Sequence, residues 1–389
     1  MATQSIREIL SRDFILGFSA QFAFLITLHI LIPTLPIYLS RLGAREAEIG
    51  VLVGVFSVSS LAFRPFVGKA LLRIPEKNFM IAGALLFVLT SGAYLLARPF
   101  WPLLVVRIVQ GVGLAFFTTA SFTLIANISP EAHRGQSLSY FWLAPNLSLV
   151  LAPALGMVLI NRFSFTVLFL VCLAVSLASL LITYQLGKRP VAPIEDASME
   201  GGFLLSRKAL PPSMISFFIY FKWGALTTFF PLYAIDHGVA NPGLFFTTIA
   251  IMLILGRTLG GRISDLYGRE RVILTFLISY VLAMGLLAFS KNLPMFILAG
   301  VIWGGGNALC LPAVMAYALD RAGASRGPAM GTFTAISDLG MFSGPVIMGL
   351  IIPFTSYPIM FLCLAFSGIL NLNYFYFFVR REGKVTPRV

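Results

Sequence analysis

Four ionisable side chains stand inside long apolar stretches of the sequence: His29, Arg107, Lys222 and Asp338. A charged side chain at the centre of a membrane helix costs about 2.5–3.5 kcal/mol on insertion scales, so such a group normally faces a partner or a water-filled space. Imidazole titrates near neutral pH, and a carboxyl group removed from water takes up a proton more readily. His29 and Asp338 are therefore candidates for carrying protons.

Each of the four residues also has an alternative interpretation. Arg107 stays protonated, so it suits orienting a polar relay or pairing with a solute rather than carrying protons. Lys222 can contact an anion or an acidic neighbour, or its long side chain can reach the membrane interface. His29 can be a neutral histidine that is hydrogen-bonded within the helix packing. Asp338 can be a fixed partner for a cation or a backbone group.

The composition says which elements must position these residues. Of 389 residues, 58% are hydrophobic and 11% are charged, whereas soluble proteins have roughly 45–50% apolar and about 25% charged residues. This composition argues against a soluble enzyme. Because a membrane-spanning helix needs about 20 apolar residues, the apolar runs predict an all-α membrane protein with twelve transmembrane helices in two pseudo-symmetric six-helix bundles. The helices are expected near 14–40, 47–70, 78–97, 101–128, 136–161, 164–186, 211–235, 243–263, 271–290, 293–319, 327–353 and 356–379.

One long polar interval, 187–210, separates the sixth expected helix from the seventh and contains prolines, paired glycines and charges of both signs. Such an interval is typical of a linker. The predicted organisation is an N-terminal six-helix bundle at 1–186, a cytoplasmic linker at 187–210, and a C-terminal six-helix bundle at 211–389 with a short cytoplasmic tail.

The basic residues follow membrane topology. The chain has 28 Lys and Arg against 15 Asp and Glu, and most basic residues outside the expected helices fall on the side that both termini share. Lys and Arg are enriched in cytoplasmic loops, so both termini are predicted to be cytoplasmic. Because the basic residues are not concentrated in one segment, nucleic acid is not an expected partner.

The two halves of the sequence are related to each other. Several residues of the first half recur 193 positions later in the second half: Arg64 as Arg257, Gly111 as Gly304, and Gly113 as Gly306. The triplet Pro-Ile-Tyr at 36–38 has a related counterpart, Pro-Leu-Tyr, 195 positions later at 231–233. An ordered series of this kind indicates a duplicated six-helix unit.

A conspicuous motif lies at the end of the eighth expected helix, where Gly261, Asp265, Gly268 and Arg269 follow Arg257. Glycine lets two helices approach closely, and a carboxylate can accept hydrogen bonds from the N-terminal amides of a neighbouring helix. The motif therefore predicts a cytoplasmic gate. The alternative is an ordinary positively charged loop with a turn glycine.

These features resemble those of the major facilitator superfamily. The motif from Gly261 to Arg269 resembles that family's cytoplasmic gating motif, and the segment 107–115 resembles its R-x-x-Q-G-x-G-x-A motif. The first-half counterpart, which begins at Gly68, departs from the pattern because Leu72 replaces the expected Asp and Pro75 the expected Gly. We therefore expect gating to depend more on Asp265 than on the first-half loop.

The resemblance implies a secondary transporter that works by alternating access, with a small-molecule solute and protons as partners and no cofactor. It also implies that the first, fourth, seventh and tenth helices line a central cavity, and that Arg107 takes part in proton coupling or gating. The expected gating residues are Arg64, Gly68, Gly111, Gly113, Arg257, Gly261, Asp265, Gly268 and Arg269. The expected lining residues are Gln21, Gln110, Tyr220, Lys222, Trp223, Trp303 and Asn307.

Proton-coupled export of a small organic compound is the favoured function. One reason is that the segment 152–156 partly resembles an antiporter motif. The first alternative is an importer or exchanger of an anionic metabolite, and the second is a non-transporting receptor or scaffold. The sequence contains no phosphate-binding loop and no metalloprotease motif, so neither catalytic nor metal-binding residues are expected. The expected protein is a monomer in the lipid bilayer of a plasma membrane, namely a prokaryotic inner membrane.

Overall fold

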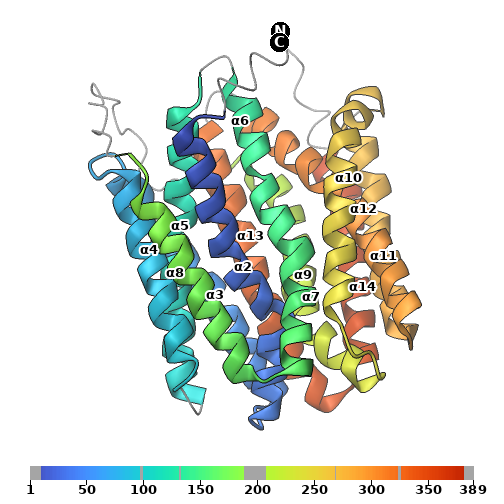
Figure 1. Cartoon of the computed structure of the whole chain (residues 1–389). Coiled ribbons are helices and arrows are strands. Elements are labelled where there is room, and N and C mark those ends of the chain that lie inside the picture. The colour runs from blue at the N-terminus through green and yellow to red at the C-terminus, as the bar shows by residue number, and fades with distance from the viewer. Residues whose placement is uncertain are drawn as a thin grey trace, which may run out of the picture. The chain divides into compact units, whose positions relative to one another are not determined.

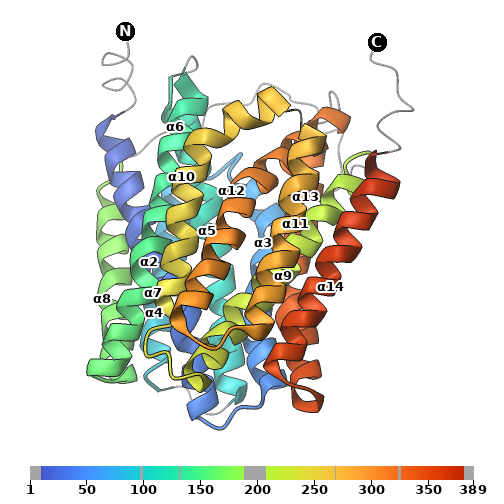
Figure 2. The same ribbon diagram turned by 90° about the vertical axis from the view of Figure 1, so that its right-hand side faces the viewer.

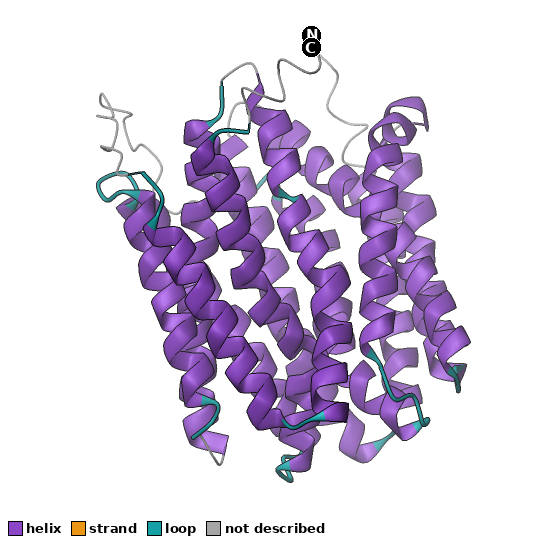
Figure 3. Cartoon of the chain, in the orientation of Figure 1, coloured by secondary structure: helices purple, strands orange, loops and turns teal. Residues whose placement is uncertain are grey.

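A computed structural model describes residues 10–96, 100–130, 133–187, 207–267, 269–322 and 326–380, apart from the side chains at 134–135, 257–267, 269, 322 and 326–328. The described residues form helices joined by short connections, and no strand occurs among them (Figure 3). In the first half the helices are α2 (Arg12–Arg41), α3 (Glu46–Ala70), α4 (Glu76–Ala93), α5 (Phe100–Ile128), α6 (Arg134–Phe141), α7 (Leu143–Arg162) and α8 (Phe165–Tyr184). In the second half they are α9 (Leu210–Asp236), α10 (Gly243–Tyr267), α11 (Arg269–Phe289), α12 (Leu293–Ala322), α13 (Arg326–Ile351), η2 (Ile352–Phe354), α14 (Tyr357–Tyr374) and η3 (Phe375–Val379).

The all-α class with twelve expected helices is confirmed, with small differences at the helix ends. Several helices begin where a polar side chain accepts a hydrogen bond from a first-turn amide, as Ser11 does for Phe14 and Ser164 for Val167. Such caps satisfy amides that have no partner within the helix.

The fifth expected helix is interrupted, because α6 ends at Phe141 and α7 begins at Leu143. The cause is Pro145, which has no amide hydrogen to bond the carbonyl of Phe141 and whose ring crowds that carbonyl. Together the two pieces still form a stretch, Gln136–Arg162, long enough to cross a membrane.

Ten helical stretches among the described residues are long and apolar enough to span a bilayer. The other two expected spans are α4, whose 18 residues begin with Glu76 and Lys77, and α10, whose apolar part Gly243–Gly256 is short. Many large apolar side chains on these helices are exposed, as the lipid-facing side of a membrane helix requires.

The chain divides into two compact units, one made of Met1–Tyr38 with Val55–Ala197 and the other of Leu39–Gly54 with Ser198–Val389. In the described part of the first unit, α4 packs against α5 and α8 (Figure 1). Its core includes Phe24, whose ring centroid lies 4.0 Å from those of Phe87 and Phe117. In the second unit, α9 packs against α13, and α11 packs against α12 and α14 (Figure 2).

The internal repeat is visible in the backbone of two helix ends. Gly43 after α2 and Gly238 after α9 have positive φ angles of 83° and 76°. The amide of Gly43 bonds the carbonyl of Ser40, and the amide of Gly238 bonds that of Ile235. The following residue in each case bonds the carbonyl five positions back. Both helices therefore end in the same left-handed glycine cap, 195 residues apart.

The repeated glycines bring equivalent helices together. A Cβ atom at Gly111 of α5 would meet the carbonyl oxygen of Phe56 on α3, and one at Gly304 of α12 would meet that of Ile249 on α10. Two residues later in each half, a second glycine approaches another helix. Gly113 approaches α4, and Gly306 approaches α11. Close approach of helix backbones is the usual role of small residues in membrane helices.

Candidate functional site

Arg107 is the buried cation of the first unit. Only 5% of it is exposed, and its Nη1 donates a hydrogen bond of 2.7 Å to Oε1 of Gln110, three residues later on the same face of α5. The guanidinium carbon lies 4.4 Å from the ring centroid of Phe56 on α3, within the range of a cation–π interaction. Tyr94 donates a second hydrogen bond, of 2.9 Å, to Oε1 of Gln110. The charge of Arg107 is thus held in a fixed position.

Two expected lining residues, Gln21 and Gln110, are buried and are used in the same way. Each accepts hydrogen bonds through Oε1, since Ser121 donates to Gln21 at 2.8 Å. The Nε2 atom of each has no hydrogen-bond partner among the described residues. Both glutamines therefore retain a buried amide donor.

His29 on α2 lies 2.8 Å, through Nδ1, from Oγ of Ser148 on α7. The imidazole is partly buried. A hydroxyl can donate to or accept from a ring nitrogen, so this contact is compatible with either protonation state of the imidazole.

Lys222 is the buried cation of the second unit. It lies on α9 with 0% of its surface exposed, and its Nζ has no hydrogen-bond partner among the described residues. Its nearest aromatic neighbours are the rings of Tyr280 and Phe218, with centroids at 5.8 and 6.0 Å. The alternative in which the side chain of Lys222 extends to the membrane interface does not fit this burial.

Three further expected lining residues lie close to Tyr280 of α11 or to each other. Tyr280 donates a hydrogen bond of 2.7 Å to Oδ1 of Asn307, and its ring lies 5.5 Å from that of Trp303. Trp303 in turn stacks on Trp223, with centroids 4.7 Å apart and planes 26° apart. The fifth candidate on α9 and α12, Tyr220, is partly buried two residues before Lys222.

Asp338 is partly buried on α13. The residue before it, Ser337, donates a hydrogen bond of 2.8 Å to Ser216 of α9. Asp338 therefore directly follows a residue at which α13 contacts α9, and its part in proton transfer stays a prediction.

The expected gating residues are described only in part. Arg64 is partly buried near the end of α3, and Gly68 has open space where a Cβ would lie. The side chains of Arg257, Asp265 and Arg269 fall outside the described residues, as do the surroundings of Gly261 and the whole of Gly268. Gating by this motif therefore stays a prediction.

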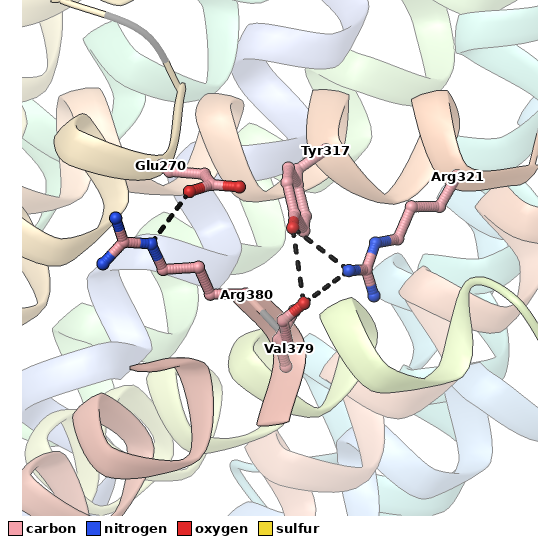
Figure 4. A network of polar contacts seen from close by, with 5 residues as sticks. All are labelled: Glu270, Tyr317, Arg321, Val379 and Arg380. Atoms are coloured by element: carbon pink, nitrogen blue, oxygen red, sulfur yellow. Dashed lines mark hydrogen bonds and ion pairs between the residues drawn. The ribbon is translucent and has the colours of Figure 1, made fainter. Parts of the chain in front are cut away.

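A polar network joins α11 and α12 to the end of the last helix (Figure 4). Nε of Arg380 lies 3.1 Å from Oε2 of Glu270, which lies in the first turn of α11. Arg321 donates hydrogen bonds to the carbonyl oxygen of Val379 and, at 3.2 Å, to the hydroxyl of Tyr317. The network anchors the C-terminal end of the helical chain to its neighbours.

We expect the Glu270–Arg380 pair to contribute little to stability, because the two side chains are 34% and 35% exposed. Exposed ion pairs are worth about 0.2–1 kcal/mol. A double-mutant cycle with Glu270→Gln and Arg380→Gln, followed by thermal unfolding in detergent, should give a coupling below about 1 kcal/mol. A larger coupling would show that the pair holds the helix end in place.

Sequence reasoning missed Tyr94, Phe56, Ser148 and Tyr280, which contact the expected residues. They lie on helices that contribute no expected lining residue, and nothing in their spacing marks them. Their contacts depend on how helices distant in sequence pack together.

Comparison with known proteins gives a consistent result. The sequence profile of the Major Facilitator Superfamily matches residues 17–256 and 213–389. The staphylopine export protein of Staphylococcus aureus strain Mu50 is 25% identical over 342 residues, covering 82% of this chain and 84% of the relative. The quinolone resistance protein NorA of Staphylococcus aureus strain COL is 24% identical over 349 residues, covering 86% and 88%.

Two solved structures share the fold. The nucleoside transporter NupG matches with a TM-score of 0.74 and 16% identity, over 94% of this chain and 98% of the other. The human organic anion transporter MFSD10 matches with a TM-score of 0.69 and 16% identity, over 93% and 98%. At these identities the structures support the fold alone.

Proposed function

Because the chain belongs to the Major Facilitator Superfamily, we propose that this multi-pass membrane transporter exports a small organic solute in exchange for protons by alternating access. Family membership identifies a transporter rather than an enzyme. Export is supported by two relatives, one named an export protein and the other a resistance protein.

The observation that carries proton coupling is the contact between His29 and Ser148. An imidazole held by a hydroxyl at 2.8 Å can gain or lose a proton while it keeps that contact. Arg107, held by Gln110 and Phe56, supplies a fixed positive charge that can orient a polar relay. Asp338 is the second candidate carrier. Protonation that favours one open state over the other would couple proton movement to solute movement.

The proposed topology places both termini in the cytoplasm of a cell with a plasma membrane, and the bundles 1–186 and 211–389 on either side of the linker 187–210. The bias of basic residues supports this orientation. The motif from Arg257 to Arg269 would form the inner gate, and the transporter would act as a monomer.

The proposal is tested by solute-dependent proton flux into proteoliposomes that contain a pH dye. We expect flux with the wild type, and at least a tenfold loss in either His29→Ala or Asp338→Asn. His237→Ala is the matched control, because this histidine lies just beyond the end of α9 and should leave the flux unchanged. Solute movement without any proton flux would overturn proton coupling and leave a uniporter or an exchanger.

Lys222 favours a second candidate function, import or exchange of an anionic metabolite. Arg107 is a buried cation within the first unit, and Lys222 is one within the second. Inhibition of transport by a range of organic anions would support this candidate, whereas a preference for neutral or cationic amphiphiles would oppose it.

A further inference from the structure

The surroundings of Lys222 do not match its charge. An ammonium group removed from water needs an anion or several acceptors to offset the loss of hydration. No carboxylate among the described residues pairs with Lys222, and its Nζ makes no hydrogen bond to them. The two neighbouring rings lie near the 6 Å limit of cation–π attraction. The described residues position this cation without supplying its counterpart.

One face of α12 is directed toward the same place. Trp303, Asn307 and Cys310 are spaced by four and three residues, so they lie on one side of the helix. Tyr280 contacts the first two of them, through its ring and its hydroxyl, and its ring centroid lies 5.8 Å from Nζ of Lys222. The ring of Tyr280 is thus the common neighbour of Lys222, Trp303 and Asn307.

Apart from Oδ1 of Asn307, which accepts from Tyr280, the polar groups of this cluster are donors. Nε1 of Trp303 is buried and has no hydrogen-bond partner among the described residues. Asn307 accepts the Tyr280 hydroxyl through Oδ1, which leaves its Nδ2 amide to donate elsewhere. An ammonium, an indole N–H and an amide N–H together call for an acceptor that carries negative charge.

We propose that Lys222, Trp303, Asn307 and Tyr280, called here the Lys222 cluster, bind the carboxylate of the transported solute. The inference rests on the proposed transport function and specifies its substrate class. The stacked Trp223 and Trp303 add a flat apolar surface beside the donors, which suits a carboxylate attached to an apolar or aromatic body. A resident inorganic anion such as chloride has the same charge, and the experiment separates the two sources.

The first test uses the purified full-length protein in lipid nanodiscs and three probes of similar shape: phenylacetate, phenylacetamide and phenethylamine. We expect phenylacetate to raise the unfolding temperature by about 3 °C or more at saturation, and the neutral and cationic probes to have no effect. Lys222→Met should abolish this response. The same substitution should raise the unfolding temperature without ligand, because it removes a buried charge that has no anionic partner.

Lys291→Met is the matched control, because Lys291 is an exposed lysine outside the helices. It should keep the wild-type response to phenylacetate. An equal response in Lys222→Met and the wild type would overturn the inference, as would the absence of any response in the wild type. Stabilisation by sodium chloride alone, with none added by phenylacetate, would assign the cluster to an inorganic anion and overturn the solute assignment.

A second measurement separates this inference from the transport function. Labelled phenylacetate is followed in counterflow across proteoliposomes that contain either the wild type or Lys222→Met. Binding that depends on Lys222 but occurs without counterflow would support the site and contradict transport of this probe. Counterflow of phenylacetamide or phenethylamine that is unchanged in Lys222→Met would support transport and overturn the site.

Discussion

Replacing Gly344 by alanine is expected to destabilise the second unit by about 1–3 kcal/mol, the usual range for an overpacked core. A Cβ atom at Gly344 would meet the carbonyl oxygen of Phe221 on α9, and one at Gly340 would meet that of Phe217. Backbone atoms cannot rotate out of the way, so α13 and α9 would have to separate. Thermal unfolding of the detergent-purified variant measures the effect.

Gly285→Ala is the control for this prediction, because Gly285 lies within α11 and a Cβ there would meet no heavy atom within 4 Å. Alanine has the higher helix propensity, so the control should be neutral or more stable by up to about 1 kcal/mol. Equal losses in the two variants would show that the close approach of α13 to α9 does not limit stability.

The same contact has a consequence for the Lys222 cluster. Phe221, whose carbonyl faces Gly344, immediately precedes Lys222 on α9. A displacement of α9 from α13 would therefore move the buried ammonium relative to Tyr280 and α12. We infer that small residues on α13 help to set the position of Lys222 through the backbone of Phe221.

Much of the fold could be predicted because a bilayer leaves few choices for a backbone. Each spanning segment must satisfy its own hydrogen bonds, so a long apolar run implies a helix. The sequence repeat also predicted equivalent helices, and the caps at Gly43 and Gly238 have the same bonds. The interruption before Leu143 was missed although Pro145 was visible, because the hydropathy of the run did not change there.

The candidate site could be predicted only in part. The sequence singled out Arg107 and Lys222 because each places a charge within an apolar run. Their neighbours Tyr94 and Tyr280 could not be identified, because hydropathy says nothing about which faces of two helices meet. The structure adds the orientation of each side chain. It thereby distinguishes a cation held by Gln110 from one that finds no such partner in the described part of the chain.

Replacing Arg107 by lysine is expected to reduce solute-dependent proton flux more than tenfold at equal protein abundance, although the charge is kept. The guanidinium is planar, so it can donate to Gln110 at 2.7 Å while its carbon lies over the Phe56 ring at 4.4 Å. A lysine has a compact ammonium on a flexible chain and cannot reproduce both contacts. The proteoliposome assay with the pH dye measures the loss.

Two further variants show whether geometry or charge is responsible. Arg107→Met should lose flux to the same extent, whereas Arg162→Lys, at an exposed position at the end of α7, should behave as the wild type. Both Arg107 variants should still fold, because Tyr94 continues to donate to Gln110. Full flux in Arg107→Lys with loss in Arg107→Met would mean that charge alone suffices, and full flux in both would remove Arg107 from the coupling mechanism.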